Sequence, residues 1–322
     1  MSELDLLRDT LPTPPPAGSQ ARARARARLF SKIDSASRGR HRVRSLSLAG
    51  AVAATALVTA VFLSVGTSGS HSDAAAAVLH KAARAALGQP GLGTLEPGQY
   101  VYTKSEVAYL STIESSYSAL VPQIREVWLG RDRTGWLHTT SGRPTFPSAR
   151  DRERWVAAGR PNLGGNASED TALGNDGGPP FTMDSLDLPT NPDALYARLA
   201  AEAAGNANGL SREMFTIIGD DLRNNYTTPA QRSALFDVAA RLPGVELVGD
   251  VTDAAGRAGV AVAMVETDMT RDELVFDRTS YELLGEEQVV MSGNSFGYPA
   301  GTVIGHATYL ERAVVDAIKQ RP

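Results

Sequence analysis

The chain has 322 residues, of which 42% are hydrophobic and none is cysteine. This hydrophobic content is sufficient for a folded core, which excludes a wholly disordered protein. The lack of cysteine excludes disulfides, cysteine-ligated zinc, iron–sulfur clusters and thiol nucleophiles. The net charge of −4 combines a basic segment up to Arg44, with ten basic and four acidic residues, and an acidic remainder. We therefore expect the two parts to face different partners.

Residues 1–44 are predicted to form a basic cytoplasmic tail. Its proline-rich linker, Pro12–Pro16, precedes alternating alanine and arginine residues, which are predicted as a helix because alanine strongly favours helix. The arginines either form a topogenic signal that contacts anionic lipid headgroups, or dock on an acidic cytoplasmic protein such as a sigma factor. Nucleic-acid binding is the least favoured interpretation, because no folded DNA-reading module fits in 44 residues. The candidate contact residues are Arg22, Arg24, Arg26, Arg28, Leu29 and Ile33.

The segment Ser45–Val65 contains 21 residues and no charge. As a helix it would be about 31 Å long, close to the hydrocarbon thickness of a bilayer. It is predicted to be a single transmembrane helix, and a cleaved signal peptide or a buried core helix are the alternatives. Four arginines precede it and form the topogenic signal: Arg38, Arg40, Arg42 and Arg44. Because excess Lys and Arg remains in the cytoplasm, we expect a cell-membrane protein with its N-terminus cytoplasmic and its C-terminal domain outside.

Residues 66–98 are predicted as a stalk and a helix that begins at Asp73 and ends at Gly88. Turn signals then separate segments that are dense in aromatic and β-branched residues. These predicted strands span 99–110, 119–130 and 134–140. Arg131–Arg133 is predicted as the hairpin turn between the second strand and the third.

The middle of the outer part is predicted to be helical. The predicted helices span 148–159, 188–205, 211–224 and 228–244. Asn191 and Thr228, each followed by proline, are typical of helix starts. The intervening loop 159–180 is rich in Gly, Asn, Asp and Pro, and its length indicates that it is either mobile or functional.

The final third returns to strands. The strand-like segments span 245–253, 259–267, 271–277, 283–291 and 301–310. A C-terminal helix is predicted around Glu311–Lys319. Helices inserted between two blocks of strands indicate an α+β fold with a curved antiparallel sheet that both blocks join. Residues 99–322 are predicted to form this single extracytoplasmic α+β domain.

Several segments spread over nearly the whole chain are distinctive in combination. They read LLRDTLPTPPP, ARARARARLF, QYVYTKSE, LPTNPDALYARL, ARLPGVELVGDVTDAAGRAGVAV, ELVFD and YPAGTVIGHATYLERAVVD. With the single span, the chain resembles a family of actinobacterial single-pass membrane proteins without an assigned activity, often encoded beside extracytoplasmic-function sigma factors. The resemblance implies a role near sigma-factor signalling but no functional site.

The resemblance has one departure that bears on mechanism. Anti-sigma factors of the zinc-binding type carry a His-x-x-x-Cys-x-x-Cys motif on a larger cytoplasmic domain, whereas this chain has no cysteine and a short tail. Direct sigma-factor inhibition by that mechanism is therefore not expected. The order of predicted elements is also similar to the half-open barrel of lipoprotein-carrier and sigma-regulator periplasmic domains, although a fold does not determine a function.

The chain contains no recognisable catalytic motif. His138 and His306 lie in predicted strands and could converge, and an outer-surface enzyme would need one of them beside a carboxylate in a cleft. A structural role is more common for a strand histidine. Asp220–Asp221 is expected on the solvated side of its helix, and Asp250 and Asp253 are expected to shape a turn. No Gly-x-Ser-x-Gly elbow or calcium-binding spacing occurs, so we expect no catalytic, cofactor-binding or metal-ligating residues and no enzymatic activity.

Aromatic residues are concentrated in the first block of strands, where core packing is the default interpretation and a ligand-lining surface is the alternative. They are Tyr100, Tyr102, Tyr109, Tyr117, Trp128 and Trp136. The leading hypothesis is a non-enzymatic, membrane-anchored protein that senses or binds an extracytoplasmic ligand in a sigma-factor-linked signalling context. The alternative is a tethered, carrier-like module that binds lipid or lipoprotein without cytoplasmic signalling.

Overall fold

The computed structural model describes residues 68–91, 95–113, 116–132, 134–164, 167–174, 188–223, 227–265, 270–292 and 297–322. All of them belong to one compact unit, Val43–Pro322. The predicted tail with its contact and topogenic arginines, and the predicted transmembrane segment, lie outside the described residues. Within the described ranges, no helix is both long enough and apolar enough to cross a bilayer.

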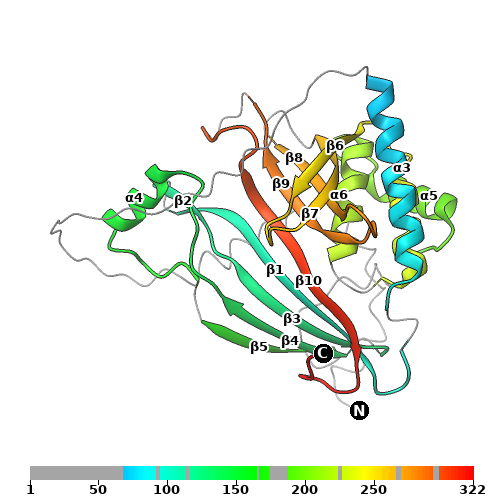
Figure 1. Cartoon of the computed structure of the whole chain (residues 1–322), viewed down its shortest axis with the longest axis horizontal. Coiled ribbons are helices and arrows are strands. Elements are labelled where there is room, and N and C mark those ends of the chain that lie inside the picture. The colour runs from blue at the N-terminus through cyan, green and yellow to red at the C-terminus, as the bar shows by residue number, and fades with distance from the viewer. Residues whose placement is uncertain are drawn as a thin grey trace, which may run out of the picture. The chain divides into compact units, whose positions relative to one another are not determined.

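Ten antiparallel strands form one sheet in the described part of the chain (Figure 1). Nine of them follow the order β5-β4-β3-β1-β10-β9-β8-β7-β6, and the short β2 pairs with the end of β1. The strands are β1 (Tyr100–Ile113), β2 (Tyr117–Leu120), β3 (Gln123–Gly130), β4 (Gly135–Ser141), β5 (Ser168–Leu173), β6 (Val245–Thr252), β7 (Ala258–Val265), β8 (Thr270–Asp277), β9 (Leu283–Val290) and β10 (Val303–Val315). Because β1 pairs with β10, both predicted blocks of strands join one sheet, and the predicted α+β class is confirmed.

The described helices are α3 (Ser68–Leu87), α4 (Ala149–Ala157), α5 (Pro192–Ala203), α6 (Leu210–Arg223) and α7 (Pro229–Ala239). Helices α3 and α6 pack on β6 and β7, α5 packs on α6, and α4 lies next to β2 at the other end of the sheet (Figure 1). Helix α7 packs against α3 and α5. We call the side of the sheet that these four helices cover the helix face, and the opposite side the outer face.

Side-chain caps determine where two of these helices begin. At α5, the Asn191 side chain accepts two backbone hydrogen bonds, each 3.0 Å long. At α7, the Thr228 and Gln231 side chains form a reciprocal capping box. Pro192 and Pro229 occupy the first helical turn, where an N–H group would have no intrahelical partner. The predicted starts of both helices are confirmed.

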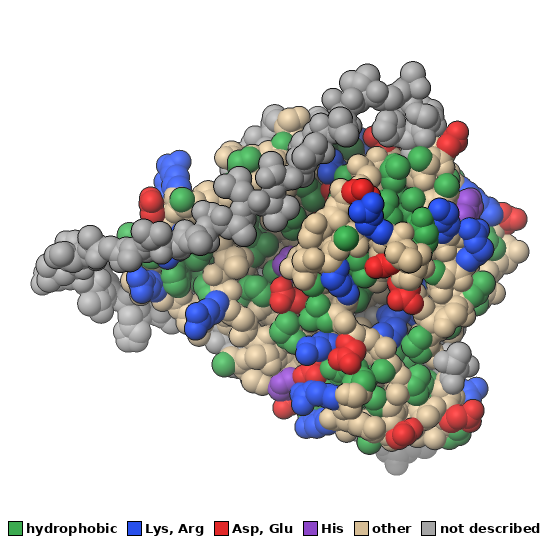
Figure 2. Space-filling view, viewed as in Figure 1, with side chains coloured by type: hydrophobic (Ala, Val, Ile, Leu, Met, Phe, Trp, Pro, Cys, Tyr) green, Lys and Arg blue, Asp and Glu red, His purple; other side chains and the backbone are tan. Residues whose placement is uncertain are grey.

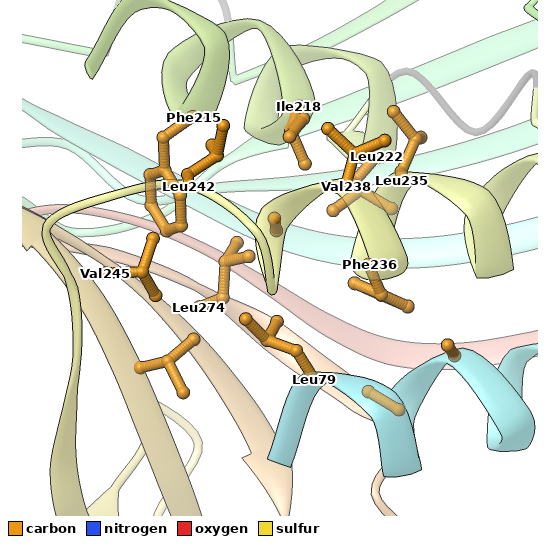
Figure 3. Close-up of a cluster of buried hydrophobic side chains, with 14 of the residues drawn as sticks. Leu79, Phe215, Ile218, Leu222, Leu235, Phe236, Val238, Leu242, Val245 and Leu274 are labelled. Carbon is orange, nitrogen blue, oxygen red and sulfur yellow. The ribbon is translucent and has the colours of Figure 1, made fainter. Parts of the chain in front are cut away.

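The main hydrophobic core lies between the helices and the helix face of β6–β8 (Figure 3). The side chains that point toward one another there include Leu79 of α3, Phe215 and Ile218 of α6, Leu235 and Phe236 of α7, Val245 of β6 and Leu274 of β8. The rings of Phe236 and Phe276 meet edge to face, with centroids 5.3 Å apart. Burying a side chain of this size stabilises a fold by about 1.5–3 kcal/mol, so this core holds the helices on the sheet.

Two predicted elements differ from the structure. The predicted C-terminal helix around Glu311–Lys319 is wrong, because β10 continues to Val315 and pairs there with Tyr100. This long-range pairing overrides the helical propensity of the segment. The predicted loop 159–180 contains strand β5, which is polar and lies at the edge of the sheet, so it shows no hydrophobic alternation.

Candidate functional site

Three arginines from separate elements converge on the helix face near the middle of the sheet. They are Arg223 at the end of α6, Arg232 in the first turn of α7 and Arg312 on β10. Tyr309 of β10 interacts electrostatically with all three. We call these four residues, together with Tyr109 and Glu286, the arginine centre.

An irregularity in strand pairing turns Arg312 toward the helices. Ser105 pairs with Tyr309, whereas the preceding Lys104 pairs with Glu311, so β10 contains one extra residue at this point. Side chains three positions apart on a regular strand face opposite sides of a sheet. The bulge therefore places Tyr309 and Arg312 on the same face.

Arg223 is neutralised within the arginine centre. Its guanidinium lies 2.5 Å from a Glu286 carboxylate oxygen and 2.8 Å from one of Asp220. The Tyr309 hydroxyl donates to Glu286 at 3.2 Å, and Gly219 allows the close approach, because a Cβ there would lie 3.1 Å from that carboxylate. Burial alone would lower the pKa of Arg223, but these carboxylates raise it well above its ordinary value. This arginine is a buried cation with its counter-charge in place.

Arg232 has no such counter-charge. Its side chain is buried, with the residue 3% exposed, and it donates to two backbone carbonyls, Thr227 O at 2.9 Å and Pro90 O at 2.8 Å. Burial, and next the neighbouring charge of Arg312, lower the pKa of Arg232 to about 9. Since that value lies above neutrality, Arg232 remains a charged group that only neutral oxygens contact among the described residues.

The unsatisfied polar atoms of the described residues are all associated with the three arginines. Four buried side-chain atoms lack a hydrogen-bond partner: Thr103 Oγ1, Thr227 Oγ1, Arg223 Nε and Arg232 Nε. Thr103 lies directly opposite Arg312 in the β1–β10 pair, and the Thr227 carbonyl accepts from Arg232. Each unsatisfied buried polar group costs about 1–3 kcal/mol, and such groups are rare in folded proteins. Their association with the three arginines marks the arginine centre as the candidate site.

The two strand histidines, which could have converged, do not meet. His138 of β4 is three strands away from β10, where the residue in register with it is Glu311. His306 lies on β10 five residues before Glu311. Strand geometry then separates the two histidines by about 20 Å. Each contacts its own carboxylate, as His138 Nδ1 lies 3.0 Å from Asp170 and His306 Nε2 lies 3.3 Å from Glu106. No group of three metal-ligating side chains occurs within the described residues.

The acidic pairs that we singled out have separate roles. Asp221 is buried, and Asp220 pairs with Arg223, so the expected solvated position of this pair is wrong. Asp253 accepts from the N–H groups of Ala255 and Arg257 and shapes the predicted turn. Asp250 forms an exposed ion pair with Arg278 at 3.1 Å instead.

A second polar cluster lies on the outer face of the same strands. Glu287 of β9 is directly opposite Glu273 of β8 and His306 of β10, and Asp253 also raises its pKa. Arg271 pairs with Glu273 at 2.7 Å and Arg257 pairs with Asp253 at 2.6 Å. Among the described residues, Glu287 has no such cation and accepts a backbone N–H from Ala254. Burial first, then Glu273 and Asp253, raise the pKa of Glu287 to about 7. We call Glu273, Glu287 and Asp253 the carboxylate cluster.

Tyr100, Tyr102, Trp128 and Trp136 pack together on the outer face, whereas Tyr109 lies beside Arg223 in the arginine centre. Tyr102 and Trp128 are buried with ring centroids 5.2 Å apart. The C-terminal segment covers them, since Trp128 Nε1 donates to Gln320 O at 2.5 Å and Arg321 binds Glu126 through two hydrogen bonds. The Arg321 hydrogen bond lowers the pKa of Glu126 to about 2 despite its burial. Packing is therefore their role in this structure.

Among the described residues, the face drawn in Figure 2 shows no concentration of basic side chains comparable to the arginine centre. On the face drawn in Figure 2, the acidic and basic side chains of the described residues are interspersed and form no extended area of one sign. The arginine centre is thus a buried feature that arises where three elements meet. Sequence reasoning missed it because its residues are far apart in the chain. The available signal was Arg232, the single basic residue of the largely apolar α7.

No protein-family model matches the chain, and no curated protein matches it. Among solved structures, it is similar to a chain from the complex of Pseudomonas aeruginosa MucA and MucB, with 10% identity and a TM-score of 0.26 over 76% of this chain and 58% of that chain. The protein thus spans less than two-thirds of that chain's length. It is also similar to an outer membrane lipoprotein-sorting protein domain from Vibrio parahaemolyticus, with 8% identity and a TM-score of 0.23 over 77% and 95% of the two chains. Likenesses this weak carry no argument about function.

Proposed function

We propose that the protein is a membrane-anchored, non-enzymatic binding protein whose extracytoplasmic α+β domain senses a ligand in a sigma-factor-linked signalling context. The observation that carries the binding role is the arginine centre, where a charged, buried Arg232 and four unpartnered buried atoms meet between helices and sheet. Buried polar groups without partners are typical of sites that a ligand completes.

The proposed anchoring rests on the sequence. The uncharged Ser45–Val65 follows four arginines, and this arrangement favours a span with the tail inside the cell. One rigid span transmits little by itself, so an outer ligand would act by changing tail exposure, oligomerisation or proteolysis. His138 and His306, the two candidates for an outer-surface enzyme, lie on separate parts of the sheet and do not share a site.

Topology is tested with the full chain carrying a different epitope at each end in intact cells. Protease added outside should remove the C-terminal epitope and spare the N-terminal one. Protection of both epitopes would contradict the anchor, and removal of the N-terminal epitope alone would reverse the orientation.

The tail is tested by capturing sigma factors on the full chain in non-ionic detergent. Replacing Arg22, Arg24, Arg26 and Arg28 with alanine should reduce capture at least tenfold, whereas replacing them with lysine keeps the charge and should preserve most of it. Equal capture by the native and alanine chains would remove sigma-factor contact from the proposal.

A tethered carrier-like module is the second candidate. The position of the arginine centre between helices and sheet favours it, because a lipid headgroup placed there would leave its acyl chains beside apolar residues of the domain. This candidate predicts ligand binding that leaves sigma-factor capture by the tail unchanged.

A further inference from the structure

We infer that the arginine centre binds a phosphate group, either free or as the headgroup of a lipid. This inference rests on the proposed binding function and names the chemistry of its ligand. The ligand would lie among Arg232, Arg312, Thr103 and Thr227, on the helix face where β1 and β10 meet the start of α7.

All four unpartnered buried atoms can donate a hydrogen bond. The guanidinium Nε of Arg223 and of Arg232 are donors only, and the hydroxyls of Thr103 and Thr227 can donate when an acceptor is present. A ligand that consists of acceptors therefore satisfies all of them at once. A ligand rich in donors would leave the two guanidinium atoms unsatisfied.

Charge also selects an anion. Arg232 and Arg312 lie close enough to disfavour each other's charge, and no carboxylate contacts Arg232 among the described residues. The charge of Arg223 is already balanced by Glu286 and Asp220. Arg223 would therefore contribute a hydrogen bond from its Nε to the ligand rather than a net charge. Arg312 interacts with Glu282, so an added anion would above all supply the counter-charge that Arg232 lacks among the described residues.

The arrangement of the donors favours phosphate over a carboxylate. They come from β1, the end of α6, the second residue before α7 and the first turn of α7, so they belong to several elements rather than to one planar group. A tetrahedral oxyanion offers acceptors in several directions, whereas the acceptors of a carboxylate are coplanar. Helix α7 has 11 residues, and the positive end of its dipole adds to the attraction for a doubly charged anion.

The test uses the full chain in a phosphate-free maltoside detergent. Inorganic phosphate is titrated in one arm and short-chain phosphatidylglycerol in the other, and acetate and diacylglycerol of matched chain length serve as controls. Binding is measured by calorimetry and by the rise in unfolding temperature, which tryptophan fluorescence reports. We expect saturable binding of at least one phosphate probe and none of acetate. Tenfold tighter binding of the lipid than of phosphate would identify a headgroup, and equal binding would identify free phosphate.

Two variants connect binding to the arginine centre. Arg232→Gln should weaken phosphate binding at least tenfold, and Thr227→Val should weaken it about threefold to tenfold while preserving side-chain shape. Arg241→Gln is the matched control, because Arg241 follows α7 but pairs with the exposed Asp193 at 2.5 Å. Binding should be unchanged in it.

Absence of saturable binding in both arms, or binding that both variants leave unchanged, would overturn the inference. Sigma-factor capture by the tail is measured in the same preparations without phosphate. Capture without phosphate binding would leave the proposed function standing and refute only the phosphate site. Phosphate binding without capture or outer exposure would refute the signalling proposal and retain the site.

Discussion

Strand β9 carries two adjacent glutamates in opposite electrostatic environments. Glu286 faces the helices and contacts Arg223 and Tyr309, in a region where Arg232 has no carboxylate contact among the described residues. Glu287 faces outward beside Glu273 and Asp253, in a region where carboxylates are in excess. Both glutamates are buried. The two faces of one strand therefore carry charge imbalances of opposite sign.

The two imbalances are relieved in different ways. A buried carboxylate can take up a proton, and the pKa of Glu287 near 7 places that event in the physiological range. A guanidinium stays protonated at neutral pH, as Arg232 does with a pKa of about 9. The outer face can thus neutralise itself, whereas the helix face needs an anion from elsewhere. This difference is the reason for proposing the helix face as the ligand-binding side.

The largest expected effect on stability comes from breaking the buried ion pair between Arg223 and Glu286. Arg223→Gln leaves Glu286 buried without its cation, and it should lower the free energy of unfolding by about 3–5 kcal/mol. Denaturant titration of the full chain in detergent measures this, followed by fluorescence of the three tryptophans. Arg241→Gln removes an exposed ion pair and should change stability by less than about 0.5 kcal/mol. Equal effects of the two substitutions would contradict a stabilising role for the Arg223–Glu286 ion pair.

Removing the excess charge of the outer face should stabilise the protein at high pH. The folded pKa of Glu287 lies above its ordinary value of 4.5, so the native state binds more protons between about pH 4.5 and 7, and stability falls as pH rises through that window. Glu287→Gln should therefore raise the free energy of unfolding by about 2–3 kcal/mol at pH 8 and leave it nearly unchanged at pH 4.5. Urea titrations at both pH values test this, and the same gain at both would assign the effect to packing.

A smaller effect is expected from increasing the carboxylate excess. Arg271→Gln removes the cation beside Glu273 and should destabilise the protein by about 1–2 kcal/mol at pH 8. The loss should shrink at pH 5, because burial raises the pKa of Glu273 and favours its protonation. Arg278→Gln, which breaks an exposed pair with Asp250, is the control and should show little change at either pH.

The smallest expected effect on stability is that of replacing Arg232, and it separates this arginine from the ion-paired Arg223. Without phosphate, Arg232→Gln should change the free energy of unfolding by less than about 1 kcal/mol. The lost hydrogen bonds to two carbonyls are offset by removal of a charge that lacks a counter-charge. Thermal unfolding in phosphate-free detergent measures it, and a loss as large as that of Arg223→Gln would indicate that Arg232 is neutralised within the protein.

Much of the local structure could be predicted from the sequence. Asn191-Pro192 and Thr228-Pro229 mark helix starts through side-chain and ring chemistry that acts within a few residues. The strands of the main sheet show dense β-branched and aromatic residues for the same local reason. Strand β5 was not predicted, because its sequence, SEDTAL, is mostly polar and shows no hydrophobic alternation. Backbone pairing with β4, rather than burial of side chains, holds it in the sheet.

The arginine centre could not be predicted, because its geometry depends on long-range pairing. Arg312 faces the helices only through the irregularity at Lys104–Ser105, which arises when β1 and β10 align. The neighbouring Glu286 and Glu287 looked equivalent in the sequence, and only the sheet separates their environments. Residues 1–65 lie outside the described part of the structure, so the sigma-factor and membrane contacts remain predictions.

The pairing of β1 with β10 also governs how the domain assembles. Glu106 and His306 contact each other across 200 residues of chain, so the centre of the sheet forms only after a very large loop closes. Until then, β1 presents a bare edge on which a foreign strand can align. We therefore expect slow refolding and a tendency to associate during it, both relieved when a peptide with the β10 sequence is supplied early.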